Sequence, residues 1–113
     1  MLRLKADLWV MAYVRTCNAA GAASYIVRKG DEHAGSIFIR ISHLNGISEL
    51  YAPAAAGLAE VAVERRWSRR LQATDAEIDA LIEREINIDP DLWLIEVEDR
   101  QGRHFLDEWL ISG

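Results

Sequence analysis

The sequence has little of what disulfide frameworks, zinc sites and membrane spans require. One cysteine, Cys17, cannot form an intramolecular disulfide and is typical of proteins in a reducing compartment. Three histidines, His33, His43 and His104, lack the spacing of zinc ligands. No segment approaches the run of about 18 apolar residues that a membrane span needs. We therefore expect a cytoplasmic protein with no metal, no cofactor and no membrane attachment.

Catalytic motifs are incomplete or absent. Gly30 and Gly35 have the spacing of a phosphate-binding loop, but Ser36 stands where that motif needs lysine. There is no serine-hydrolase elbow, and the cysteine lacks the histidine and asparagine pattern of a catalytic thiol. Residues 90–98 have acids spaced as in the metal-binding core of restriction-type nucleases, but Glu98 replaces the lysine that activates water there. These absences favour a non-enzymatic protein.

What the chain does contain is ordinary for a globular domain, with 50% hydrophobic and 27% charged residues. Its 113 residues fit one domain with one core. The net charge of −5 is unevenly spread, since residues 1–70 carry a balance of +4 and residues 71–113 a balance of −9. Either the two halves face each other inside the fold, or oppositely charged faces attract a partner or a second copy.

Two segments have the signals of long helices. In residues 6–20 apolar side chains recur at every fourth position, and Asp7 is placed to cap the first turn. Thr74 and Glu77 form a capping box, in which each side chain satisfies a free backbone N–H group of the other residue. The capping box predicts a second helix over residues 75–88.

Alternating apolar and polar residues predict strands at residues 24–29 and 36–43. The glycine-containing segment between them has turn chemistry, so the two strands are expected to form a hairpin. Asn45-Gly46 is a strong hairpin signal and leads into a third strand, residues 47–51. The sequence therefore predicts a three-stranded antiparallel meander.

The remaining segments complete the sheet. Residues 61–71 predict a fourth strand, with a short helix from Leu58 as the alternative. Residues 92–97 are apolar on both faces apart from Glu96, which predicts a central fifth strand. In residues 104–113 a short helix is favoured over a strand. We expect a single layered domain of the α+β class, with a mostly antiparallel sheet of about five strands and two main helices packed on it.

Glu96 is the residue that most strongly suggests a site, because an acid in an apolar strand needs a partner if it is buried. Arg15 and Arg28 are the expected partners, and together with Asp99 and His104 they define a candidate polar ligand pocket. The alternative is a salt-bridged turn, in which the arginines that follow the strand neutralise these acids.

A basic cluster, residues 65–70, contains one aromatic residue. On a strand, Arg65, Trp67 and Arg69 would share a face, as an aromatic platform for single-stranded nucleic acid does. The acidic net charge and the lack of a second basic stretch argue against nucleic acid. Arginines also keep an exposed edge strand soluble. We expect an edge strand or a partner surface here.

Several features together resemble a known family. They are Leu8-Trp9-Val10 before Arg15 and Cys17, the turn residues Gly30-Asp31 and Ala34-Gly35, and above all the run Asp89-Pro90-Asp91-Leu92-Trp93 through Glu96-Val97-Glu98-Asp99-Arg100-Gln101-Gly102-Arg103-His104-Phe105-Leu106. Over nearly the whole chain the sequence is similar to the bacterial domain-of-unknown-function family numbered 1491. The resemblance implies a compact layered α/β domain and implies no activity. Residues 107–113 lie at or beyond it and are expected to be a variable tail.

Three hypotheses about function follow. The leading one is a non-enzymatic interaction or regulatory module that self-associates, as a homo-oligomer, through exposed strand edges and opposite charge. The second is a small enzyme or ligand-binding protein with a polar pocket around Arg15, Arg28, Glu96 and Asp99. The third is single-stranded nucleic-acid binding along residues 65–70.

Overall fold

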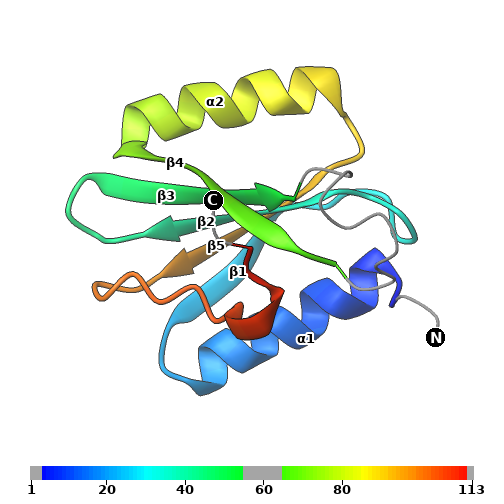
Figure 1. Cartoon of the computed structure of the whole chain (residues 1–113), viewed down its shortest axis with the longest axis horizontal. Coiled ribbons are helices and arrows are strands. Elements are labelled where there is room, and N and C mark those ends of the chain that lie inside the picture. Colours follow the sequence, from blue (N-terminus) through cyan, green and yellow to red (C-terminus); the bar gives the residue numbers. More distant parts are fainter. Residues whose placement is uncertain (1–3, 55–64, 112–113) are drawn as a thin grey trace.

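In the part of the chain that the structure describes, two α-helices lie on opposite faces of one five-stranded sheet (Figure 1). The computed structural model describes residues 4–54 and 65–111. In chain order the elements are α1 (Ala6–Ala19), β1 (Ala23–Arg28), β2 (Ile37–Ser42), β3 (Ile47–Pro53), β4 (Trp67–Thr74), α2 (Asp75–Ile88), β5 (Trp93–Glu98) and the 3-10 turn η2 (Asp107–Trp109). The strand order is β1-β5-β2-β3-β4; β2 and β5 are parallel and the other three pairs are antiparallel. The expected α+β class is confirmed.

Each face of the sheet has its own apolar layer, because successive residues of a strand point to opposite faces. Under α1 the layer includes Ile37, Ile39 and Ile41 of β2 and Trp93, Ile95 and Val97 of β5. Under α2 it includes Phe38 and Leu94 from the same two strands, together with Ile78 and Ile82 of the helix. The predicted central position of β5 is confirmed, since β5 lies between β1 and β2.

The predicted hairpin between β1 and β2 is wrong, and with it the first step of the meander. β5 lies between these two strands, antiparallel to β1 and parallel to β2. The hairpin between β2 and β3 is confirmed, with Gly46 in the left-handed region at φ 90°. Alternation identified the strands themselves, but it carries no information about which strand lies beside which.

The glycine loop between β1 and β2 serves the start of β5 rather than a hairpin. The Asp31 N–H donates to the carbonyl of Asp91 at 2.9 Å, and the Trp93 indole donates to the carbonyl of Asp31 at 2.8 Å. A Cβ at Gly30 would lie 2.2 Å from the Asp91 oxygen, so only glycine permits this approach of two backbones. The loop therefore fixes the start of β5 through backbone contacts.

The fourth strand, predicted over residues 61–71, is observed as Trp67–Thr74, and residues 65–66 of the prediction lie outside any strand. Residues 61–64 of that prediction, and the alternative helix from Leu58, lie outside the described residues. β4 exposes most of its side chains after Trp67, so no alternation of burial marks its end. It runs directly into the capping box of Thr74, whose hydroxyl accepts from the Glu77 N–H at 3.2 Å, as predicted.

The first and last helical predictions need correction. Lys5 occupies the N-cap of α1 and makes no side-chain bond, while Asp7 lies in the first turn and its N–H donates to the carbonyl of Glu32. Of the helix predicted over residues 104–113, residues 104–111 contain only the single turn of η2, and residues 112–113 lie outside the described part of the chain. Phe105, with a φ of 56°, lies outside the right-handed helical region, so no helix runs through it into η2.

Within the described residues, no helix has both the length and the apolar character needed to cross a membrane.

Candidate functional site

The polar pocket predicted around Glu96 is not assembled from the predicted residues. Arg15 is exposed on α1. Arg28 donates to the carbonyl of Pro90 at 2.6 Å. The ring of His104 lies against Tyr51, with 5.4 Å between centroids.

Asp99 matches the alternative interpretation, a salt-bridged turn. Its two carboxylate oxygens accept from the Arg103 guanidinium at 3.0 and 3.1 Å. These bonds hold the pKa of Asp99 below its usual range. The pair fixes the turn that leads from β5 to residues 104–111, hereafter the C-terminal segment.

The partner of Glu96 is Arg40, which the sequence interpretation missed. Arg40 faces Glu96 in the parallel register of β2 and β5, with Nε 4.0 Å from Oε1. Arg40 also forms ion pairs with Asp75 and Asp79 of α2. Tyr25 donates to the other oxygen of Glu96 at 2.9 Å. The predicted hairpin placed the wrong strand beside β2 and so concealed this pairing.

Glu96 lines a groove as well as pairing with an arginine. The groove has a volume of about 240 Å³ and lies between α2 and the β1–β5 side of the sheet. Its charged lining residues are Arg40, Asp79, Glu83 and Glu96. Arg40 is already engaged by three carboxylates, so it is not available to a ligand as a free cation.

The basic segment does not form an aromatic platform. Trp67 is 1% exposed, donates to the carbonyl of Ile37 at 2.8 Å and packs on Trp9. Arg69 pairs with Glu49 at 3.2 Å, and Arg65 donates to the carbonyl of Leu4. A buried indole cannot stack on a base, so the geometry needed for the nucleic-acid hypothesis is missing here.

A buried carboxylate, Glu49, organises a polar cluster that was not predicted. It receives hydrogen bonds from Tyr51 at 3.0 Å and Arg69 at 3.2 Å, and lies 2.6 Å from His43 Nε2. Burial opposes its ionisation, but these partners hold the pKa of Glu49 below its usual range. His43 and Glu49 are diagonal neighbours across the Asn-Gly hairpin, a signal that the sequence did contain.

Each edge strand of the sheet is obstructed at one place or more. At β1 the Asn18 side chain accepts from the Ser24 N–H and donates to the Ser24 carbonyl, each at 3.0 Å, and so occupies the place of a neighbouring strand. The register shifts between Ile26 and Arg28, a bulge that interrupts the edge. At the other edge, Leu110 forms a parallel bridge with Trp67 of β4.

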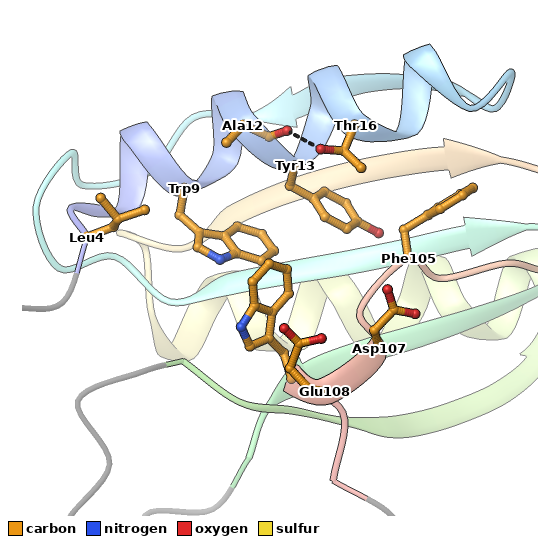
Figure 2. A pocket seen from close by; sticks show the side chains of 9 residues that line it. Leu4, Trp9, Ala12, Tyr13, Thr16, Phe105, Asp107 and Glu108 are labelled. Atoms are coloured by element: carbon orange, nitrogen blue, oxygen red, sulfur yellow. Dashed lines mark hydrogen bonds between the residues drawn. The ribbon is translucent and has the colours of Figure 1, made fainter.

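A second cavity, hereafter the aromatic pocket, lies between α1 and the C-terminal segment (Figure 2). Its volume is about 240 Å³. Four rings line it, those of Trp9, Tyr13, Phe105 and Trp109. The other lining residues are Leu4, Ala12, Thr16, Asp107 and Glu108. The sequence interpretation noted the fourfold spacing on α1 but assigned those rings only to the core.

The chain matches the family model described as "Protein of unknown function (DUF1491)" over residues 4–107. The crystal structure of a DUF1491 family protein from Caulobacter crescentus CB15 is 37% identical, with a TM-score of 0.80, over 99% of this chain and 100% of that one. An NMR structure of a DUF1491 family protein from Caulobacter crescentus CB15 is 38% identical, with a TM-score of 0.81, over 99% of both chains.

The solution structure of protein Atu0922 from A. tumefaciens is 40% identical over 86% of both chains, with a TM-score of 0.75. No curated protein matches the chain at a significant level. The relatives therefore agree with the fold and assign no activity. On the family match and these structures, the chain belongs to the DUF1491 family, whose function is unknown.

Proposed function

We propose that this protein is a non-enzymatic binding module whose recognition site is the aromatic pocket. The observation that carries the proposal is a cavity walled by four aromatic rings and bordered by exposed residues of α1 and the C-terminal segment. Binding sites are typically concave and mostly apolar, with a few polar groups that orient the ligand. We place the protein in the cytoplasm, a compartment that the free thiol of Cys17 favours.

The α1 wall of the aromatic pocket is rigid before any ligand arrives. Trp9 and Tyr13 are 7% and 3% exposed, and their rings stack at 5.0 Å. The Tyr13 hydroxyl donates to the carbonyl of His104 at 2.6 Å, which ties the helix to the C-terminal segment. Trp9 also contacts Trp67, with 4.3 Å between centroids. A preformed wall loses little conformational entropy on binding.

The opposite wall is held in a strained backbone conformation. Phe105 and Asp107 both have positive φ, and for a bulky residue such as phenylalanine this is a rare state. They flank Leu106, whose side chain is fully buried in the core. Such strain costs about 1–3 kcal/mol per residue and concentrates at functional sites. The two left-handed residues keep Phe105 and Asp107 on the cavity while Leu106 anchors the segment.

The volume limits what the aromatic pocket accepts. Sites for drug-sized ligands span roughly 300–1,000 Å³, and this one measures about 240 Å³. It therefore suits a single head group or one side chain. The remainder of a larger ligand or partner would lie outside, over exposed Ala12 and Thr16 of α1.

The test is a fragment screen on the full chain, followed by backbone and indole NMR shifts. We expect hits to shift the resonances of residues 9–16 and 105–109. Ala12→Leu fills the cavity from an exposed helical position and should abolish binding without unfolding the protein. Ala80→Leu is the matched control, because Ala80 is exposed on α2, on the other face of the sheet. Hits that map elsewhere, or that survive Ala12→Leu, would overturn the proposal.

A further inference from the structure

The charged residues that line the aromatic pocket are both acidic. Asp107 and Glu108 are exposed on the C-terminal segment, and Figure 2 shows them across the cavity from the rings of Trp9 and Tyr13. Carboxylates at the wall repel an anion, and a neutral apolar group gains nothing from them. The charge of the lining therefore selects a cation.

Of the two tryptophans that line the aromatic pocket, Trp109 is partly exposed and Trp9 is buried. Trp9 and Trp109 meet edge to face, with centroids 5.6 Å apart and planes at 65°. Tyr13 continues the same wall beside Trp9. A cation within about 6 Å of a ring centroid is attracted by the electron-rich face, and tryptophan attracts it most strongly. Trp9 is 7% exposed and packed against Tyr13 and Trp67, so the partly exposed Trp109 is the tryptophan that a bound cation can meet, above the buried rings of Trp9 and Tyr13.

The ring of Phe105, which lines the aromatic pocket, already interacts with a cation of the protein itself. The guanidinium carbon of Arg103 lies 5.1 Å from the centroid of the Phe105 ring. Arg103 is held there by its two hydrogen bonds to Asp99 and does not line the cavity. The cation over Phe105 therefore lies outside the aromatic pocket and does not fill it.

We infer that the aromatic pocket binds an alkylated ammonium group, such as a trimethylammonium head group. A bare ammonium is strongly hydrated and would lose that water among mostly apolar walls. An alkylated ammonium fills the same walls with methyl groups and keeps its charge for the rings and the two carboxylates. The group could belong to a free small molecule or to an alkylated lysine side chain, which share this chemistry. The inference rests on the proposed function and names its ligand.

Choline and its uncharged carbon analogue separate charge from shape. The analogue carries a tert-butyl group in place of the trimethylammonium group, so the two probes have nearly the same size. We expect choline to shift the Trp109 indole resonance of the full chain and to bind about tenfold more tightly than the analogue. Equal affinities would overturn the cation inference but leave the binding function standing. If neither probe binds and the fragment screen is also silent, the proposed function fails as well.

Variants test the two features that the inference uses. Trp109→Leu keeps an apolar side chain but removes a ring, and should weaken choline binding roughly tenfold. Glu108→Gln removes one acidic charge from the wall and should weaken it several-fold. Glu83→Gln changes the net charge equally, from an exposed position on α2, and should leave affinity unchanged. If Glu83→Gln weakens binding as much as Glu108→Gln, the effect is general electrostatics and the inference is wrong.

A peptide that carries trimethyllysine identifies the source of the group. Binding of the peptide well above that of choline would assign the pocket to an alkylated side chain on a protein partner. Binding of choline and tetramethylammonium with no gain from the peptide would assign it to a free small molecule. The unmethylated peptide is the control, and binding as tight as that of the trimethylated form would contradict the inference.

Discussion

Arg40 of β2 and Glu96 of β5 face each other across the parallel strand pair, with Arg40 Nε 4.0 Å from Glu96 Oε1. The Arg40 side chain is 12% exposed and also pairs with Asp75 and Asp79, so one guanidinium joins the sheet to α2. The stabilisation of the α2 face depends on this residue more than on any one of its carboxylates.

Arg40→Met should therefore destabilise the protein by about 2 kcal/mol, because it leaves three carboxylates near one another without their cation. Glu96→Gln should cost less, since Arg40 keeps its two partners on α2. Urea denaturation gives the free energies of unfolding. Arg84→Met, at an exposed position of α2, is the control and should change stability by less than about 0.5 kcal/mol. Equal effects of Arg40→Met and Arg84→Met would contradict this account.

The pairing of strands that are far apart in the sequence is the part of this fold that the sequence could not predict. The alternation in β2 and the apolar run of β5 identified both strands, yet nothing local indicated that β5 lies between β1 and β2. Pairing over so long a sequence separation is decided by the packing of whole elements. The Arg40–Glu96 contact exists only in the register of that pair, so it was unpredictable for the same reason.

Local signals, in contrast, correctly predicted features whose residues are only a few positions apart in the sequence. The capping box at Thr74 and the Asn-Gly turn before β3 are both confirmed. The spacing on α1 correctly indicated buried rings, but spacing alone cannot show that the C-terminal segment leaves a cavity beside them. Phe105 lines that cavity with a positive φ, a backbone conformation that the local sequence does not predict.

The buried carboxylate of Glu49 should make stability depend on acid pH. Its pKa is lowered in the folded state, so its contribution is present above the unfolded pKa of about 4.3 and is lost as pH falls through the folded value. Glu49→Gln should be less stable at pH about 7 and should lose less stability on acidification than the wild type. Urea midpoints measured from neutral pH to about pH 3 test this. A wild-type and variant pair with parallel pH profiles would contradict it.

Alanine substitutions at two glycines with positive φ distinguish the stability cost of backbone strain from the cost of a steric clash. Gly21 has φ 90° and open space around its Cβ position, whereas Gly102 has φ 70° and a Cβ there would lie 2.6 Å from His43 Cε1. Gly21→Ala should cost about 1 kcal/mol, from strain alone. Gly102→Ala should cost more, because it also displaces His43 from Glu49. Thermal unfolding of the two variants checks the order, and a larger loss for Gly21→Ala would be the contrary result.

We expect Trp67 to contribute to the stability of the fold and not to bind nucleic acid. Its ring is buried against Trp9, and its indole N–H donates to the carbonyl of Ile37. Trp67→Phe should lower the free energy of unfolding by about 1–3 kcal/mol, through the lost volume and the lost hydrogen bond to the Ile37 carbonyl. The wild-type chain should show no binding to a labelled single-stranded oligonucleotide at moderate salt. Binding that survives moderate salt would restore the nucleic-acid hypothesis.

We predict that Asn18 prevents the β1 edge from pairing with a strand of a second copy of the chain. Its amide satisfies both backbone groups of Ser24, and beside that contact Tyr25, Ile26 and Val27 are each more than 40% exposed. Asn18→Ala should free this edge for pairing with a second copy, because an open, apolar strand edge templates association. Light scattering at tens of micromolar should then show a larger mass for Asn18→Ala than for the wild type, whose own self-association the same measurement tests. Asn87→Ala, at an exposed site on α2, is the control. If Asn18→Ala and Asn87→Ala both keep the wild-type mass, the bulge at Val27 is enough to close the edge, and the role assigned to Asn18 is wrong.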